Sequence, residues 1–476
     1  MRTTLQKIGL ILSGILLGVT LTAYLPAIAD REAASATLPL DELREFSEVF
    51  GKIKSDYVEP VSDKKLIDDA ITGMLAGLDP HSEYMDADAF KELQDGTQGQ
   101  FGGLGIEVGM EDGLIKVIAP IEDTPAQKAG IKTGDLIVKL DDTPVKGMTI
   151  NEAVKRMRGE PNTPIVLTIV RKGVNKPFSV KVMRAVIKVK SVKYQLVDPN
   201  YGYVHITQFQ EHSGEDLVKA INALTAQNKA PLKGVVLDLR NDPGGLLNSA
   251  VAVAATFLKP DSLVVYTDGR TEDSRMRLTA NPENYLRGAQ DSDYLRDLPG
   301  WIKTVPMVVL INGGSASASE IVSGALQDHK RAVIMGTQSF GKGSVQTILP
   351  LGNGTGIKLT TARYFTPSGR SIQAKGITPD IVVEEGKVVS DGDSDGGLLN
   401  IHEADLENHL ANPNPGTKGS GKTPPRIVPP ESAAKTPAAP ANPDEVVHKN
   451  DFQLTQALDL LKGINILAHD TSQAKN

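Results

Sequence analysis

The hydrophobic pattern of the chain changes its period along the sequence. Between residues 38 and 95, apolar residues recur at intervals of three and four, which predicts packing helices. Between residues 98 and 186, short β-type runs alternate with glycine, and one helix is expected at Ile150–Arg158. From residue 187 to residue 385, apolar strands alternate with amphipathic helices. The pattern therefore predicts an α/β core, preceded by helices and by a β-rich domain.

The residues after this core are polar at first and amphipathic at the end. Residues 386–450 are rich in Asp, Gly and Ser, and then in Ala, Pro and Lys. Such a segment cannot bury enough apolar area to offset the entropy of ordering it, so we expect a flexible linker. Residues 451–476 predict a C-terminal helix, which could pack on the core of this chain or on another subunit.

The first residues have the pattern of an export signal. Arg2 and Lys7 precede an apolar run over residues 8–25, and Ala27-Ile28-Ala29 has the order of a cleavage site. We therefore expect residues 1–29 to be a signal peptide that exports the chain to the periplasm or another extracytoplasmic compartment. The apolar run is also close to the roughly 20 residues that span a bilayer, so it fits an uncleaved membrane anchor as well.

Composition excludes several classes of function. The chain has 51 basic and 58 acidic residues, a net charge of −7 and 4% aromatic residues. It therefore lacks the basic surface and the stacking residues that are typical of nucleic-acid binding. Without cysteine it has no disulfide, thiol nucleophile or thiolate metal site, and its eight histidines form no His-Glu-x-x-His zinc pattern. We expect no nucleic-acid partner, no metal and no cofactor.

A glycine-rich loop leads into a strand at Phe101–Ile106. Its backbone amides could form a nest for the carboxylate of a peptide C-terminus, and the peptide would add to the sheet as a strand. The stretch Thr124–Asp135 reads Thr-Pro-Ala-Gln-Lys-Ala-Gly-Ile-Lys-Thr-Gly-Asp. Together the two motifs resemble bacterial PDZ domains over residues 98–186, although such glycines also suit simple left-handed turns. The expected substrate-binding residues are Gly103, Leu104, Gly105 and Ile106.

Ser317 lies where an apolar strand gives way to a helix. The sequence over Asn312–Ile321 reads Asn-Gly-Gly-Ser-Ala-Ser-Ala-Ser-Glu-Ile. The free amides of a helix N-terminus can stabilise the negative charge that develops on a substrate carbonyl during amide hydrolysis. Ser317-x-x-Glu320 is equally a capping box that would simply start the helix. These residues alone leave both interpretations open.

Lys342 lies between two glycines, in the sequence Phe-Gly-Lys-Gly-Ser-Val-Gln over Phe340–Gln346. Glycine lets neighbouring backbone approach closely. Burial in such a site lowers the pKa of a lysine, so that it can act as a general base toward a serine hydroxyl. Taken alone, Lys342 also fits a solvated surface lysine.

In combination, the two segments resemble the C-terminal processing, or tail-specific, peptidases, which are Ser–Lys proteases with a PDZ domain. The resemblance runs from about Leu40 to Glu385 and includes Asp-Leu-Arg-Asn-Asp-Pro-Gly-Gly over Asp238–Gly245. It implies a crotonase-like α/β protease core with an inserted β-rich PDZ domain. It also implies catalytic roles: Ser317 as nucleophile, Lys342 as base, Gln346 to orient the lysine, and the amides of Gly244 and Ala318 as the oxyanion hole. The sequence does not distinguish Gly244 from Gly245.

The resemblance implies an ATP-independent serine endopeptidase that recognises substrate C-termini through its PDZ domain. Its partners would be the C-terminal segments of exported or membrane proteins, and family members also form homo-oligomers and use activating adaptor proteins. Because an open protease would be hazardous, a gate is expected. Arg158, at the end of the PDZ helix, is the candidate for relaying peptide occupancy.

Other interpretations fit less well. Gly336-x-x-x-x-Gly341-Lys342 begins like a P-loop, but a glycine follows where Ser or Thr would hold magnesium. In a Ser-His-Asp triad, His329 would lie about 18 Å along the helix from Ser317. His81 is expected to be structural. A catalytically inactive PDZ scaffold, which would not need Lys342, is the alternative function.

Overall fold

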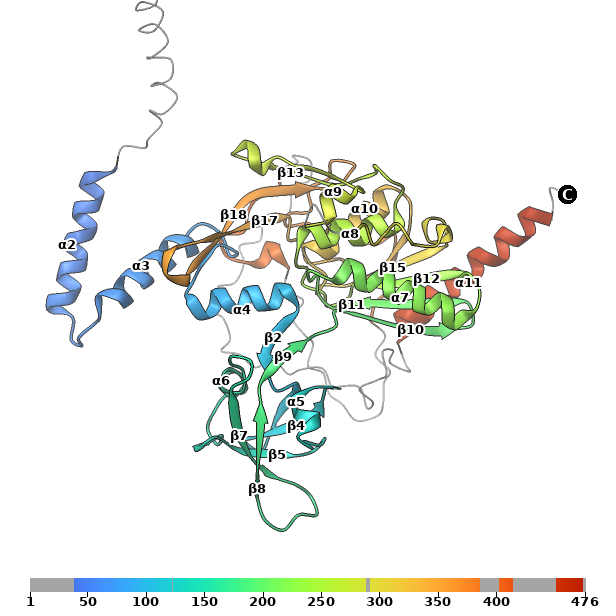
Figure 1. Ribbon diagram of the computed structural model, residues 1–476. Helices are drawn as coiled ribbons and strands as arrows, with labels where there is room; N and C mark the ends of the chain where they lie inside the picture. Colours follow the sequence, from blue (N-terminus) through green and yellow to red (C-terminus); the bar gives the residue numbers. More distant parts are fainter. Residues whose placement is uncertain (1–37, 122, 288–291, 386–401, 414–450, 474–476) are drawn as a thin grey trace, which may run out of the picture. The chain divides into compact units, whose positions relative to one another are not determined.

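The computed structural model describes residues 38–121, 123–287, 292–385, 402–413 and 451–473 (Figure 1). The chain divides into two compact units, residues 1–71 and 72–476. The predicted signal peptide lies outside the described residues. Within the described ranges, no helix is both long and apolar enough to cross a membrane.

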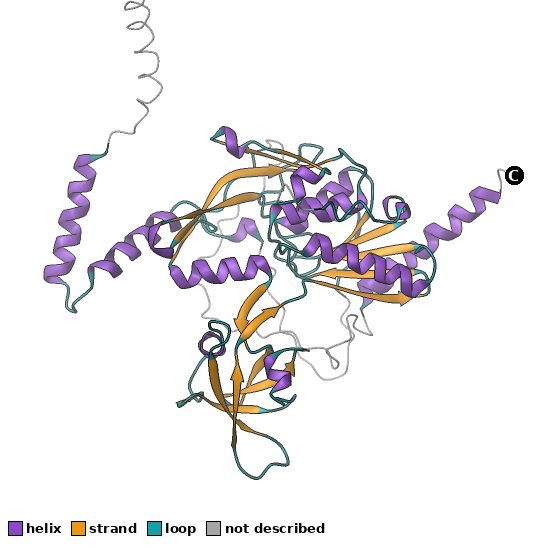
Figure 2. Cartoon of the chain, viewed as in Figure 1, coloured by secondary structure: helices purple, strands orange, loops and turns teal. Residues whose placement is uncertain are grey.

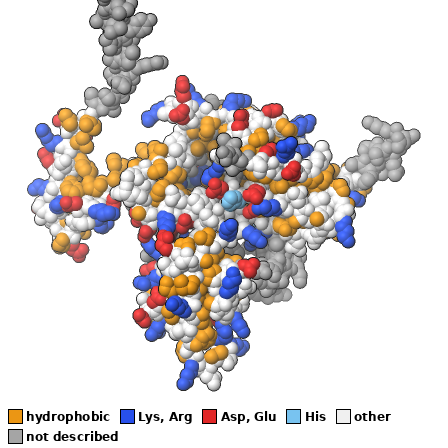
Figure 3. Space-filling view, in the orientation of Figure 1, with side chains coloured by type: hydrophobic (Ala, Val, Ile, Leu, Met, Phe, Trp, Pro, Cys, Tyr) orange, Lys and Arg blue, Asp and Glu red, His pale blue; other side chains and the backbone are white. Residues whose placement is uncertain are grey.

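The described part of the first unit is helical, as its apolar spacing predicts. Helix α2 spans Leu40–Asp56, and α3 spans Asp63–Ala76 across the boundary between the units. No residue of α2 is buried, and Phe46 and Val49 are among its exposed apolar side chains. Figure 3 shows apolar side chains at the surface of this part of the chain. The amphipathic pattern therefore forms a helix here whose apolar side chains stay at the surface.

Residues 98–186 include a β-rich domain with its own core. The six-stranded antiparallel sheet has the order β3-β4-β5-β7-β8, with β6 beside β5, so β3 is an edge strand. Alternate residues such as Ile115 and Val117 are fully buried, as the period of a half-buried strand requires. The elements are β3 (Ile106–Glu111), β4 (Leu114–Pro120), α5 (Pro125–Lys128), β5 (Leu136–Leu140), β6 (Thr143–Pro144), α6 (Ile150–Met157), β7 (Pro164–Val170) and β8 (Phe178–Met183).

A pair of strands connects this domain to the rest of the second unit. Strand β2 (Gln100–Gly103) enters the domain and β9 (Ala185–Lys188) leaves it, and the two pair antiparallel. Helix α4 (Ala87–Gln98) precedes β2; Asp86 caps its start, and Gly99 ends it at φ +71°. Because entry and exit lie side by side, the β-rich domain is an insertion in the chain (Figure 2).

The α/β core is built on a six-stranded sheet of order β10-β11-β12-β15-β16-β19. Only the β10–β11 pair is antiparallel. β12 and β15 are buried at every residue, as expected for parallel strands covered on both faces. The strands are β10 (Val192–Asp198), β11 (Tyr201–Ile206), β12 (Gly234–Asp238), β15 (Met307–Ile311), β16 (Val333–Gly336) and β19 (Ile381–Val382).

Helices cover the two faces of this sheet. α7 (Ser213–Asn228), α8 (Leu247–Phe257) and α10 (Ala318–Asp328) bury one face in the largest apolar cluster. α11 (Phe452–Gln473) covers the other, where Leu454, Ala457 and Leu461 are buried against the strands. Of the two predicted positions for the C-terminal helix, the structure has the one on the chain's own core.

A second sheet carries the loop with the predicted base. Its order is β1-β18-β13-β14, and β17 pairs with β18. β17 and β18 form a hairpin, which turns at Gly352–Gly354. β1 lies in a stretch predicted to be helical; its strand form comes from tertiary pairing with β18. The remaining elements are β1 (Glu83–Met85), β13 (Leu263–Gly269), η1 (Glu272–Ser274), β14 (Arg277–Thr279), α9 (Pro282–Tyr285), η2 (Gly300–Lys303), β17 (Ser344–Pro350) and β18 (Gly356–Phe365).

One segment differs from the predicted flexible linker over residues 386–450. Residues 402–413 pack on the core, with a short helical turn, η4, at Glu403–Asp405. The Glu403 side chain is completely buried. The apolar pattern of the sequence does not predict this packing, because the buried contacts of the segment are hydrogen bonds between polar groups. The rest of the predicted linker lies outside the described residues.

Candidate active site

Ser317 occupies a sharp turn between β15 and α10. Its backbone has φ +52° and ψ −110°, a conformation that costs a residue with a side chain about 1–3 kcal/mol. The N–H of Glu320 donates to the Ser317 carbonyl oxygen at 2.9 Å, and Ser317 and Glu320 also form the capping box that the sequence predicts. Ser317 therefore starts α10 as a capping residue, and the same position places its side chain at the positive end of the helix.

The glycine loop after β12 packs against Ser317. A methyl group placed on the Cα of the buried Gly244 would lie 2.8 Å from Ser317 Cβ and 2.8 Å from the amide nitrogen of Ala318. The Gly244 N–H donates to Asp242 Oδ1 at 2.8 Å. The N–H groups of Ala318 and Gly245 have no acceptor among the described residues. Gly244 thus packs against Ser317, while the N–H groups of Ala318 and Gly245 are available to donate hydrogen bonds to an anion.

A single carboxylate joins the serine to the lysine loop. Glu320, fully buried on α10, accepts the Ser317 N–H at 2.8 Å and the Lys342 N–H at 3.0 Å. It also accepts the Gly341 N–H at 2.8 Å and the Ser339 hydroxyl at 2.6 Å. Burial raises the pKa of Glu320 to about 7, and these four hydrogen bonds oppose the rise. The carboxylate therefore fixes the backbone of the serine relative to that of the lysine.

The amine of Lys342 lies in a desolvated position. The pKa of Lys342 is lowered to about 8, mainly by burial and also by the nearby Lys358, while Glu403, Glu320 and Asp79 act in the opposite direction. The Lys342 amine forms no hydrogen bond or ion pair within the described part of the chain. A lysine with this pKa is partly neutral near neutral pH, as a general base must be.

The structure brings Ser317 and Lys342 into one site without joining their side chains. No hydrogen bond connects Ser317 Oγ with Lys342 Nζ among the described residues. The Tyr364 hydroxyl lies between the two segments: it donates to the Lys342 carbonyl oxygen and forms a side-chain hydrogen bond with Ser317. Burial raises the pKa of Tyr364 well above its usual value, so this hydroxyl keeps its proton.

Gln346 lies on β17, close to the base but turned to other partners. Its Nε2 donates to Ser344 Oγ at 3.0 Å and to Thr360 Oγ1 at 3.3 Å. In the described residues it makes no hydrogen bond to Lys342. An orienting role would therefore need a rotation of the glutamine side chain.

Several polar residues near Lys342 were not predicted from the sequence to belong to the active site. The Ser-x-x-Glu spacing pointed to Glu320 only as a helix cap, and His81 was expected to be structural. No local pattern marks the others, because their contacts depend on tertiary structure. The neighbours are Asp79, His81, Glu320, Tyr364, Gln373 and Glu403.

The predicted peptide-binding loop leads into the edge strand β3. Gly103, Leu104 and Gly105 are buried, and Gly105 has φ +76°. A Cβ at Gly105 would lie 2.3 Å from Thr124 Cβ, so the loop and the second sequence motif are in direct contact. The unpaired side of β3 can accept an extended peptide by strand addition.

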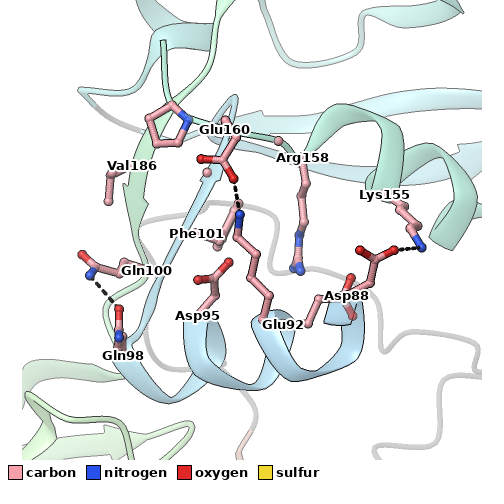
Figure 4. A pocket seen from close by; sticks show the side chains of 14 residues that line it. Asp88, Glu92, Asp95, Gln98, Gln100, Phe101, Lys155, Arg158, Glu160 and Val186 are labelled. Atoms are coloured by element: carbon pink, nitrogen blue, oxygen red, sulfur yellow. Dashed lines mark hydrogen bonds and ion pairs between the residues drawn. The ribbon is translucent and has the colours of Figure 1, made fainter. Parts of the chain in front are cut away.

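Arg158 borders a cleft of about 360 Å³ between the β-rich domain and α4. Its guanidinium lies 4.7 Å from the ring centroid of Phe101, and its Nε is buried with no acceptor among the described residues. Figure 4 shows the side chain pointing toward α4, between Glu160 and the ion pair Lys155–Asp88. Arg158 thus contacts the strand that leads into the peptide-binding loop.

Comparison with known proteins agrees with these features. Residues 200–383 match the model of peptidase family S41, residues 102–182 match a PDZ domain, and residues 24–89 match the N-terminal domain of the activating protease CtpB. The chain is 46% identical over 462 residues to the carboxy-terminal-processing protease of Bartonella bacilliformis, covering 96% of each chain. It is 34% identical over 375 residues to the carboxy-terminal processing protease CtpB of Bacillus subtilis, covering 78% of this chain and 73% of the relative. This chain therefore belongs to peptidase family S41, as a serine protease of the carboxy-terminal-processing type with a PDZ domain.

Proposed function

We propose that the chain cleaves extracytoplasmic proteins after capturing their C-termini, with Ser317 as nucleophile and Lys342 as general base. The observation that carries this proposal is Glu320, whose carboxylate binds the backbone amides of both residues. The lowered pKa of Lys342, to about 8, supports the role of base. The positive end of α10 supports a nucleophile at its first turn.

In the proposed reaction, the neutral amine of Lys342 takes the hydroxyl proton of Ser317 as Oγ attacks the peptide carbonyl. The amides open beside the serine stabilise the resulting oxyanion. The Lys342 ammonium then gives its proton to the leaving amine, and an acyl-enzyme forms. Water next transfers a proton to Lys342 as it attacks the acyl carbon. The Lys342 ammonium then returns that proton to Ser317 Oγ as the ester bond breaks, which releases the product and restores both the serine and the neutral amine.

This reaction needs side-chain movement, because no hydrogen bond joins the hydroxyl of Ser317 to the amine of Lys342 among the described residues. Binding of a substrate C-terminus to β3 would trigger this movement, and Arg158 would relay it to the active site. Gln346 would then turn toward the lysine. An adaptor protein or a second copy of the chain would be a further effector. The reaction would use no ATP and no metal. The apolar run of residues 8–25 supports an extracytoplasmic location.

The test is cleavage of an unstructured protein with an apolar C-terminus, without ATP or metal. Wild type should cut it, and Ser317→Ala and Lys342→Ala should not. Lys330→Ala, which removes an exposed lysine just after α10, is the control and should cut like wild type. If Ser317→Ala or Lys342→Ala retains wild-type activity, the assignment of that residue is wrong.

A further inference from the structure

Residues 402–413 return to the core beside the predicted base. The Glu403 N–H donates to the carbonyl oxygen of Phe340, two residues before Lys342, at 3.1 Å. Asn412, at the other end of the segment, donates to the carbonyl oxygen of Gln373 at 2.8 Å. The segment is therefore fastened at both ends to the backbone around the lysine loop.

The side chain of Glu403 has no exposed surface and both of its oxygens have partners. Gln373 Nε2 donates to Oε1 at 2.9 Å, and His81 Nε2 lies 2.7 Å from Oε2. Burying a carboxylate is costly unless it is hydrogen bonded in this way. A buried carboxylate is weak evidence for a purely stabilising role, because an apolar side chain would fill the same space at a lower cost in free energy.

Both partners of Glu403 lead to the catalytic loop. Gln373 Oε1 accepts the N–H of Gly343, which follows Lys342, at 2.9 Å. His81 belongs to a turn in which Asp79 accepts the His81 N–H at 2.9 Å and the Thr360 hydroxyl at 3.0 Å. Thr360 in turn accepts from Gln346. Glu403 thus connects the two sides of the site through hydrogen bonds.

Glu403 also contributes charge. The charged groups that act on the Lys342 amine are Lys358 on β18, Glu320 on α10, Asp79 in the turn before β1, and Glu403. Of the three carboxylates, Glu403 has the largest effect in favour of the ammonium form. Its position therefore influences how much neutral amine exists at a given pH.

We propose that Glu403 is a positioning residue of the active site, which holds the lysine loop through Gln373 and sets the electrostatic field at the amine of Lys342. The proposal rests on the proposed role of Lys342 as base. Residues 402–413 are then a part of the catalytic site contributed from beyond the protease core.

The test is the pH dependence of kcat/KM in the full chain carrying Glu403→Gln. Glutamine keeps the size of the side chain and can still accept from Gln373, but it removes the negative charge. Since that charge favours the ammonium form of Lys342, its loss should move the acid limb of the profile to lower pH by roughly half a unit or more. Glu403→Asp keeps the charge but shortens the reach, so it should lower kcat with a smaller shift of the limb.

Glu407→Gln is the matched control, because it makes the same change at an exposed position of the same segment. It should leave both rate and profile as in wild type. Thermal unfolding of each variant reports whether it is folded. A folded Glu403→Gln with the wild-type profile, or with a lower rate and an unshifted acid limb, would overturn the proposal. Activity that is equal in wild type and Lys342→Ala would instead refute the proposed base.

Discussion

The carboxylate of Glu320 accepts the backbone N–H of Lys342 at 3.0 Å, although the two residues lie on different elements of the core. The same carboxylate accepts the N–H of Ser317 at 2.8 Å. The nucleophile and the base are therefore positioned through their backbones by a third residue. Their relative placement then depends on Glu320 more than on any direct contact between their side chains.

Replacing Glu320 with Gln should lower kcat by about 100-fold, because small misplacements of catalytic groups have effects of this size. The glutamine amide would turn its own N–H groups toward backbone N–H donors, so at least one segment must move. Steady-state kinetics on a peptide substrate measures the effect, and KM should change less than kcat. Glu272→Gln, at an exposed position, is the control. A folded Glu320→Gln with wild-type kcat would contradict the positioning role.

The activity should rise with pH through about 8. Lys342 acts as a base only when neutral, and burial lowers its pKa to about 8, so the neutral fraction grows between about pH 7 and pH 9. The profile of kcat/KM against pH should therefore have an acid limb near pH 8. Lys342→Arg should be inactive across the range, because a guanidinium is not deprotonated in proteins. A flat profile between pH 6 and pH 9 would argue against a lysine base.

Most of the architecture was predictable because it follows local patterns. The apolar runs that became β12 and β15, the helix after Ser317 and the glycine-rich motifs all keep a short-range signature in the sequence. The polar shell around Lys342 has no such signature. His81 and Glu403 are 322 positions apart, and only the folded chain brings them within 2.7 Å. From the sequence, the polar segment that contains Glu403 has the composition of a linker, because the hydrogen-bond donors that bury its carboxylate come from distant parts of the chain.

Arg158 should affect the response to peptide more than the unstimulated rate. Its guanidinium lies over Phe101, at the start of the peptide-binding loop, and faces the cleft beside α4. In Arg158→Ala, a peptide with an apolar C-terminus should stimulate cleavage less than it does in wild type. Arg156→Ala, an exposed neighbour on α6, is the control. If the peptide stimulates wild type and Arg158→Ala equally, Arg158 does not relay peptide occupancy.

Asp242 should make stability depend on pH. Its side chain is completely buried, Oδ1 accepts the Gly244 N–H, and Oδ2 has no partner among the described residues. Burial raises its pKa to about 8. A carboxyl whose pKa is higher in the folded than in the unfolded state contributes stability that is fully present below about pH 4 and is lost as pH rises through about 8.

Asp242→Asn removes this titration while it keeps an acceptor for Gly244. The difference in unfolding temperature between the variant and wild type should therefore be small at pH 5, about one unit above the pKa of the carboxyl in the unfolded chain, and should widen as pH rises toward 8. At pH 9 the variant should be the more stable, because wild type then carries a buried charge. Asp273→Asn, at an exposed site, should follow wild type at both pH values. If the difference between Asp242→Asn and wild type is the same at pH 5 and pH 9, the carboxyl of Asp242 does not titrate in this range.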